Sequence, residues 1–263
     1  MDKVRPTRRS FLARAAAGAG AAALAGCDQL SRSAGFGNFL RGAEILMRPV
    51  QRAFAGANAL APEFTKADIA PEFRANGTLD PNTDRYRALA ANGFRDWRLT
   101  VDGLVDTPLS LSLDQLRAMP SRTQITRHDC VEGWSCIGEW AGTPLSLVLA
   151  AARPKPAARF VMFFCADPME GRDDPRAPKG PFYYESLDLT EANHPQTILA
   201  YQMNGQALPI KHGAPIRLRA ERQLGYKMAK YVMRISLVED FAAIRGGKGG
   251  YWEDKGYTWW AGI

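Results

Sequence analysis

The stretch T-R-H-D-C-V-E-G-W-S-C, Thr126 to Cys136, places a cysteine among charged side chains, with a second cysteine six residues further along. Three roles are open to Cys130 on this evidence. It could form a disulfide with Cys136, act as a nucleophile, or bind a metal. The beginning of the chain and the remaining cysteines bear on the choice.

The first residues have the pattern of an export signal. Basic residues precede the pair Arg8-Arg9, which is followed by Ser10-Phe11-Leu12 and a weakly apolar Ala/Gly run. This order is typical of a twin-arginine signal. The apolar run is far shorter than the roughly 20 residues that span a bilayer, so we expect no transmembrane helix there. Residues 1–26 are therefore predicted to be a twin-arginine signal. The chain is then predicted to be exported to the periplasm or the outer face of a bacterial inner membrane. That route carries folded proteins, which favours a cofactor inserted before export.

A second signal follows directly. Leu24-Ala25-Gly26-Cys27 is similar to the lipid-attachment box of bacterial lipoproteins, and acylation of Cys27 would anchor the protein at about 0.8 kcal/mol per buried methylene. The alternative is an ordinary cleavage site. Residues 27–72 are predicted to be a tether and approach segment. Apolar residues at helical spacing from Phe36 predict a short amphipathic helix that ends at Pro49 and packs as a strap on the main domain.

Composition limits the class of partner. The formal charge is +7, and the predicted signal contributes +4 of it, with five basic residues against one acidic. The remaining +3 is too small to indicate nucleic acid. The roughly 237 residues after the signal are enough for a domain with a substantial core.

The chain after Trp97 reads as an α+β domain of mixed strands and short helices. The predicted strands are Trp97–Val101, Gln124–Cys130 running into a turn at Gly133, Arg159–Cys165, Ile198–Met203, Ile216–Ala220 and Tyr231–Val238. A capping box at Ser112 and Gln115 predicts a helix over Leu113–Met119. A second helix is predicted up to about Ala152, with Thr143 as the N-cap and Pro144 at the first helical position.

The cysteine count argues against complete disulfide pairing. If Cys27 is acylated, three cysteines remain, Cys130, Cys136 and Cys165. An odd number in an oxidising compartment leaves at least one outside any intramolecular disulfide.

Two further roles for Cys130 can be compared. Zinc fits poorly, because the chain has no C-x-x-C and only three histidines, His128, His194 and His212. Arg127 and His128 would favour a nucleophilic thiolate, yet a hydrolase also needs a base held by an orienting group. A soft thiolate ligand to a metal held mainly by another group remains open.

The residues around Cys130 carry a specific resemblance. R-H-D-C-V-E-G-W-S followed by Trp140-Ala141-Gly142-Thr143-Pro144-Leu145 resembles the cysteine segment of the sulfite oxidase-fold molybdoenzymes, close to the branch of the periplasmic methionine sulfoxide reductase catalytic subunit. Matching motifs follow in order at Leu199–Tyr201, Asn204-Gly205, His212–Arg217, Gly225–Val232 and Gly250–Tyr257. The resemblance covers roughly residues 73–263, which are predicted to form a molybdopterin-binding oxidoreductase domain.

This resemblance implies a molybdenum-molybdopterin cofactor with Cys130 as the protein ligand of the metal. A thiol bound to a metal loses its proton, so Cys130 needs no partner base. Arg127, His128 and Arg172 are candidates for handling an anion at the metal, and surface charges are the alternative. Of these, Arg127 and His128 are predicted to be catalytic together with Cys130.

The resemblance also implies residues that bind the pterin and its phosphate. His212 and Arg217 fall at such positions, and the planar guanidinium of Arg217 suits phosphate. Met228, Ala229 and Lys230 fall on a second cofactor-binding stretch, and Asn76 and Cys165 match looser positions. The alternatives are a turn for Asn76, a solvated strand residue for Lys230 and a core residue for Cys165.

The substrate is left open by two departures from the reductase branch. That branch has an asparagine where this chain has His212, and its Asn-Asn-x-Tyr-Glu stretch is not recognisable here. We therefore expect a two-electron oxygen-atom transfer on a small or sulfur-containing substrate, sulfoxide or sulfite-like.

Electrons are expected to be exchanged with a separate haem protein, either a membrane protein or a cytochrome. The chain has no C-x-x-C-H haem site and no iron-sulfur cysteine set of its own. The rival functions are a non-catalytic binding protein on the same fold and a cysteine hydrolase.

Overall fold

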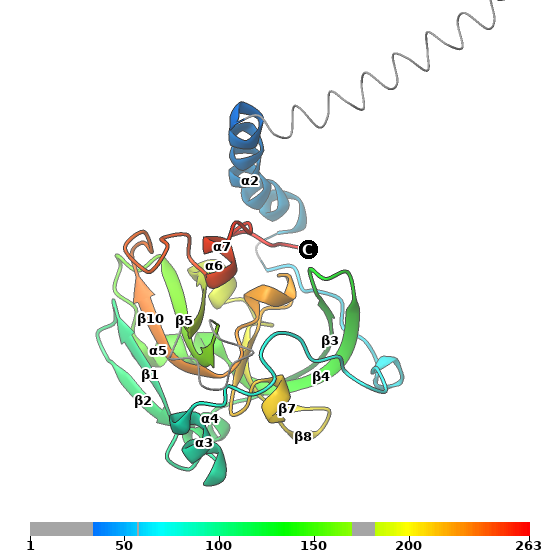
Figure 1. Ribbon diagram of the computed structural model, residues 1–263, viewed down its shortest axis with the longest axis vertical. Coiled ribbons are helices and arrows are strands. Elements are labelled where there is room, and N and C mark those ends of the chain that lie inside the picture. The colour runs from blue at the N-terminus through cyan, green and yellow to red at the C-terminus, as the bar shows by residue number, and fades with distance from the viewer. Residues whose placement is uncertain (1–33, 57, 170–181) are drawn as a thin grey trace, which may run out of the picture. The chain divides into compact units, whose positions relative to one another are not determined.

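The computed structural model describes residues 34–56, 58–169 and 182–263 (Figure 1). The predicted export signal, Cys27 and Arg172 lie outside the described residues. The chain divides into two compact units between Arg52 and Ala53. Among the described residues, no helix combines the length and the apolar character that a membrane span requires.

The predicted N-terminal helix is present but longer than expected. Helix α2 runs from Ala34 to Ala55 and contains Pro49, so the prediction that it ends at this proline was wrong. An internal proline removes one backbone hydrogen bond, and the strong helix formers on both sides continue the helix past it. Leu46, Met47 and Val50 are exposed on this helix. Packing of the segment as a strap stays a prediction.

Two five-stranded sheets form the frame of the described residues. The first has the order β2-β1-β10-β5-β6, in which β1 and β10 are parallel and the other neighbours are antiparallel. Its strands are β1 (Arg98–Gly103), β2 (Leu109–Ser112), β5 (Phe160–Pro168), β6 (Phe182–Asp188) and β10 (Val232–Val238). The second has the order β3-β4-β7-β8, with β9 also paired to β7. Its strands are β3 (Arg122–Asp129), β4 (Ser135–Pro144), β7 (Ile198–Met203), β8 (Gln206–Ala207) and β9 (Arg217–Arg219).

Short helices connect and cover these strands. They are α3 (Asp84–Ala91), α4 (Leu113–Ala118), α5 (Leu145–Ala152), α6 (Leu189–Ala192) and α7 (Tyr251–Asp254), with 3-10 turns η1 (Lys66–Asp68), η2 (Ile210–His212) and η3 (Gly225–Lys227). The predicted capping box is confirmed, because Ser112 Oγ accepts from Gln115 N and Gln115 Oε1 accepts from Ser112 N. The predicted N-cap at Thr143 was wrong. Pro144 caps α5, and the Thr143 hydroxyl donates instead to Leu116 O at 2.8 Å.

Strand β4 was not predicted from the sequence. The glycine at position 142 of this strand is required by a close contact. A Cβ at this position would lie 2.2 Å from Leu199 O, so the close approach of β4 to β7 requires glycine. Strands β2 and β6 were also not predicted, while the strand over Ile198–Met203 has the predicted bounds.

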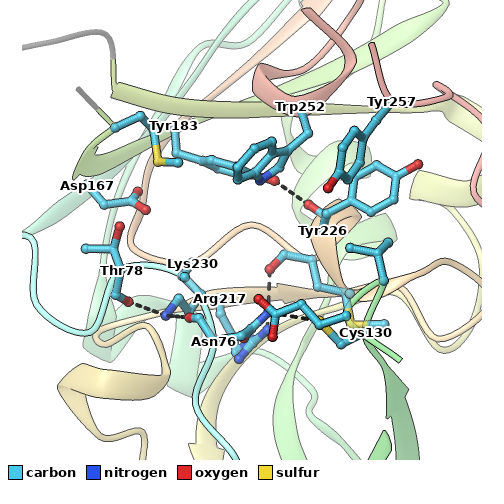
Figure 2. A pocket seen from close by; sticks show the side chains of 16 residues that line it. Asn76, Thr78, Cys130, Asp167, Tyr183, Arg217, Tyr226, Lys230, Trp252 and Tyr257 are labelled. Carbon is cyan, nitrogen blue, oxygen red and sulfur yellow. Dashed lines mark hydrogen bonds between the residues drawn. The ribbon is translucent and has the colours of Figure 1, made fainter. Parts of the chain in front are cut away.

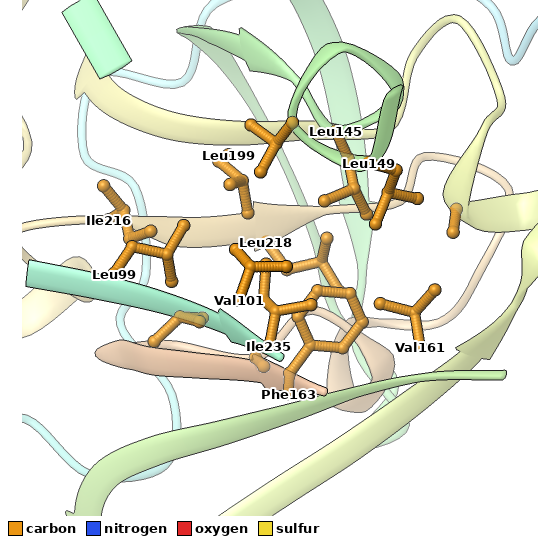
Figure 3. Packing of buried hydrophobic residues seen from close by; sticks show 14 of the residues in the cluster. Leu99, Val101, Leu145, Leu149, Val161, Phe163, Leu199, Ile216, Leu218 and Ile235 are labelled. Atoms are coloured by element: carbon orange, nitrogen blue, oxygen red, sulfur yellow. The ribbon is translucent and has the colours of Figure 1, made fainter. Parts of the chain in front are cut away.

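The main core lies where side chains of the two sheets meet (Figure 3). Leu99, Val101, Phe163 and Ile235 come from the first sheet, and Leu199 and Leu218 from the second, with Leu145 and Leu149 of α5 beside them. This contact holds the sheets together and fixes the position of β9, which carries Arg217.

Truncation of Leu218 tests the importance of this contact. Leu218 is 0% exposed, so Leu218→Ala should lower the free energy of unfolding by about 2–5 kcal/mol, because it removes buried methyl groups and leaves a cavity. Chemical denaturation at equal cofactor content measures the change. The control is Leu79→Ala, since Leu79 is 55% exposed and should change stability by about 0.5 kcal/mol or less. Equal losses in the two variants would contradict this packing.

Candidate functional site

A cavity of about 190 Å³ opens above Cys130 (Figure 2). Its wall is formed by Asn76, Gly77, Thr78, Cys130, Val131, Glu132, Asp167, Met169, Tyr183, Arg217, Gly225, Tyr226, Met228, Lys230, Trp252 and Tyr257. These residues come from both sheets and from the loops between them. The site therefore depends on the sheet packing described above.

Cys130 is presented by a tight turn between β3 and β4. The two strands pair up to Asp129 and Ser135, Cys130 N donates to Trp134 O at 2.9 Å, and Gly133 N donates to Cys130 O at 3.0 Å. Gly133 has a φ of +84°, which favours glycine and confirms the predicted turn. Cys130, Cys136 and Cys165 are free thiols, and Cys130 is the one in the cavity wall among the described residues.

The environment of Cys130 suits a metal ligand better than a nucleophile. Burial raises the pKa of the thiol, although Asn76 Nδ2, 4.0 Å from Sγ, opposes the shift. A cysteine nucleophile needs a lowered pKa and a nearby base. The neighbouring His128 contacts Met228 Sδ and Arg219 instead. A metal would deprotonate the thiol directly.

Arg217 provides a buried cation at the same cavity. Its side chain is almost fully buried on β9, and its guanidinium lies 5.0 Å from the ring centre of Trp140. Nη1 donates to His212 O at 3.1 Å and Nη2 to Met228 O at 3.4 Å, while the buried Nε has no hydrogen-bond partner among the described residues. Burial, with Arg219 nearby, lowers the pKa of Arg217 to about 9. An anionic acceptor in the cavity would give Nε a hydrogen-bond partner and would stabilise the charged guanidinium.

Lys230 lies on the same side of the cavity as Arg217 and Asn76 (Figure 2). It is 8% exposed, and Nζ donates to Asn76 O at 2.7 Å, to Thr78 O and to Lys211 O at 3.2 Å. Lys230 is therefore a buried residue, and the solvated alternative does not hold. Its contacts fix the segment that carries Asn76 beside Cys130.

The two residues predicted to be catalytic beside Cys130 do not line the cavity. Arg127 is exposed, and its Nε pairs with the Asp129 carboxylate at 2.9 Å. His128 is completely buried, and burial together with Arg219 holds its pKa well below the usual value, so the ring is neutral. Because Arg219 can only donate, Nδ1 of His128 accepts its hydrogen bond at 3.0 Å and the ring proton lies on Nε2.

His128 instead supports the loop that forms the cavity wall. Its Nδ1 lies 3.3 Å from Met228 Sδ, and a Cβ on Gly225 would lie 2.4 Å from its Nε2. Glycine at 225 is therefore required for the loop to rest on this ring.

The other predicted cofactor residues divide into two groups. Met228 lines the cavity together with Asn76, Arg217 and Lys230. The remaining three do not belong to its wall: His212 packs edge-on against Phe73 with ring centres 5.6 Å apart, and Cys165 and Ala229 belong to the main core. Burial raises the pKa of the Cys165 thiol well above its usual value. The surroundings of Cys165 are therefore those of a core residue, which was the alternative to a cofactor-binding role.

An aromatic wall was missed by the sequence analysis. Figure 2 shows Tyr226, Trp252 and Tyr257 on the side of the cavity opposite Asn76, Arg217 and Cys130. Trp252 and Tyr257 stack with ring centres 5.3 Å apart, and Tyr226 meets Tyr257 edge-on at 5.3 Å. These residues belong to the motifs Gly225–Val232 and Gly250–Tyr257. In the sequence their aromatic side chains indicate packing and give no sign that they face a cavity.

Comparison with known proteins assigns the family. The model of the oxidoreductase molybdopterin binding domain matches residues 88–243. A putative protein-methionine-sulfoxide reductase subunit YedZ1 of Azospira oryzae is 36% identical over 261 residues, covering 98% of this chain and 88% of that protein. The protein-methionine-sulfoxide reductase catalytic subunit MsrP of Ralstonia nicotianae is 32% identical over 234 residues, covering 88% and 69%. The crystal structure of the sulfane dehydrogenase SoxCD from Paracoccus pantotrophus matches 56% of this chain and 39% of that chain, with 25% identity and a TM-score of 0.48.

The chain therefore belongs to the molybdopterin-binding oxidoreductases. It is an enzyme, its cofactor is molybdenum-molybdopterin, and the predicted fold of mixed sheets and short helices is confirmed. The cavity fits such a group, because it offers one thiol to a metal and one buried guanidinium with an unused donor to an anion.

Acid should destabilise the fold through His212. Burial, with Arg217 and Lys211 nearby, lowers its pKa from 6.5 to about 4. Between these values His212 binds more protons in the unfolded chain than in the folded one, so its contribution to stability falls as pH decreases from 6.5 to about 4 and is constant below. Denaturant unfolding across this range should show a weaker pH dependence in His212→Gln than in the unmodified chain. An unchanged slope in the variant would show that His212 is not the responsible group.

Proposed function

We propose that the protein reduces a sulfoxide, with methionine sulfoxide as the substrate class, by two-electron oxygen-atom transfer at the cavity above Cys130. The observation that carries the proposal is the free thiol of Cys130 facing a cavity whose opposite side is aromatic. Both named relatives are methionine-sulfoxide reductase subunits, which supports the substrate class. Aromatic faces suit the methyl and methylene groups of the substrate side chain and the thioether of the product, whose sulfur contacts aromatic rings favourably.

We assign the cofactor-binding roles within residues 73–263 as follows. Cys130 would bind molybdenum through its thiolate, and Arg217 would donate to an anionic group of the cofactor. Lys230 and Asn76 would shape the wall beside the metal, and Met228 would pack on the cofactor. When bound, the cofactor supplies the two-electron chemistry, and the protein's task is to orient it and to exclude water.

The remaining proposals concern the cellular setting. The Arg8-Arg9 signal supports export by the twin-arginine route, and Leu24–Cys27 supports a lipid anchor on the outer face of the inner membrane. Electrons would come from a separate haem protein. Both relatives are named as subunits, which supports a partner on another chain.

Loss of the Cys130 thiol should remove the metal, while loss of the Cys136 thiol should not. Cys130→Ala is expected to retain less than about a tenth of the molybdenum of the unmodified protein or to lose its thiolate-to-metal absorption, since a soft thiolate ligand is removed. Cys136→Ala is the matched control, because Cys136 lies on β4 outside the cavity wall. Elemental analysis and absorption spectra measure both. Full metal and an unchanged spectrum in Cys130→Ala would overturn the assignment.

The substrate is tested by a screen with an artificial electron donor or acceptor. Turnover of free and peptide-bound methionine sulfoxide is expected with a reduced donor, and sulfite with an acceptor is the comparison. Oxidation of sulfite without any sulfoxide reduction would refute the proposed direction and substrate.

A further inference from the structure

A buried charge cluster lies behind the cavity wall formed by Tyr183. It consists of Glu185 on β6, Lys227 on η3 and Glu253 on α7, whose side chains are at most 1% exposed. Lys227 Nζ donates to Glu253 Oε1 at 2.6 Å and also to Glu185 Oε1. None of these three residues lines the cavity, so the binding roles above do not use them.

Among the residues that the structure describes, the charges of this cluster do not balance. Two carboxylates and one ammonium leave one negative charge in the interior, which is costly without a counter-charge. The groups facing it from β5 are Cys165 and Asp167, and neither adds a positive charge. Arg245 lies over the ring of Tyr184, whose side chain points to the other face of β6. Burial and Glu253 raise the pKa of Glu185 well above its ordinary value, although Lys227 opposes the shift.

The hydroxyl of Tyr183 gives a second indication that a proton is held here. It donates to Tyr226 O, and Glu185 Oε2 lies 3.5 Å away, which is longer than a usual O–H···O hydrogen bond. One hydroxyl proton cannot satisfy both oxygens. If the Glu185 carboxyl is protonated, it donates to the tyrosine oxygen while Tyr183 donates to Tyr226. Tyr183 also lines the cavity, so it connects the cluster to the site (Figure 2).

We propose that Glu185 stores a proton and that Tyr183 transfers it to the cavity during turnover. This inference rests on the proposed function, in which a sulfoxide, two protons and two electrons give a sulfide and water. The sulfur–oxygen bond breaks, two oxygen–hydrogen bonds form, and the separate redox protein supplies the electrons. Tyr183 gives its hydroxyl proton to the departing oxygen and takes one from Glu185. Solvent at the cavity supplies the second proton and also returns one to Glu185 through Tyr183, because Glu185 is buried and Tyr183 lines the cavity. In the opposite direction, with sulfite and water, the same groups would accept a proton.

The stored proton can be measured without turnover. At neutral pH the infrared spectrum of the purified protein should contain the carbonyl band of a buried protonated carboxyl, which shifts in D₂O. The band should disappear in Glu185→Gln, which keeps an oxygen for the hydrogen bond from Lys227. A band that persists in Glu185→Gln and disappears in Glu253→Gln would place the proton on Glu253 and overturn the proposal.

The transfer is tested by the pH profile of the rate. Tyr183→Phe should slow turnover by roughly 100-fold and make the rate rise about tenfold per unit of acidification, because protons then come directly from solvent. Tyr184→Phe is the control. It removes a neighbouring hydroxyl of the same strand that donates to Asp254, and it should leave rate and profile unchanged. Equal rates and profiles in the two variants, at equal molybdenum content, would refute the relay.

Failure of the relay can be told apart from failure of the proposed function. If sulfoxides are reduced and Tyr183→Phe behaves like Tyr184→Phe, the relay is wrong while the function stands. If only sulfite is turned over, the substrate is wrong. The same two variants compared on sulfite then support the relay when Tyr183→Phe alone is slowed, and refute it otherwise.

Discussion

The structure depends on two arginines buried side by side on β9. Arg217 and Arg219 lie with their guanidinium carbons 5.0 and 4.4 Å from the ring centre of Trp140. Arg219 is neutralised by Glu221, which accepts hydrogen bonds from its Nε and Nη2. No carboxylate pairs with Arg217 among the described residues. A buried cation left without a counter-ion is costly, so its burial at the cavity wall makes sense only if the cavity receives an anion.

The charges around the cavity are arranged in opposite senses on its two sides. Near Arg217 the surplus is positive, and neutral His128 accepts from Arg219 and so avoids adding to it. Behind Tyr183 the surplus is negative, because Glu185 and Glu253 share one lysine. An anionic cofactor belongs on the first side, and a group that holds protons belongs on the second. In the roles proposed above, the two sides divide cofactor binding from proton supply.

The sequence was sufficient for the family, the cofactor and the turn that presents Cys130, because these depend on short contiguous motifs. The resemblance also named Cys130, Asn76, Arg217, Met228 and Lys230, which line the cavity. The aromatic side of the wall was missed, because proximity there is created by the packing of distant segments. Arg127 and His128 closely precede Cys130 in sequence, yet strand alternation turns Arg127 to solvent and buries His128 beneath Gly225. Tyr183 belongs to a strand that the sequence did not reveal, and Trp252 gave only a packing signal.

Cofactor binding and folding should be coupled in this protein through Arg217. A ligand that binds only the folded state stabilises it in proportion to the logarithm of its concentration over its dissociation constant. Here the bound group would also satisfy the unused Nε of Arg217 and neutralise its charge. The cofactor-free fold therefore carries a cost that the loaded fold does not. A chain with this property gains most from acquiring its cofactor before it leaves the compartment where the cofactor is made, and a twin-arginine signal would allow that order of events.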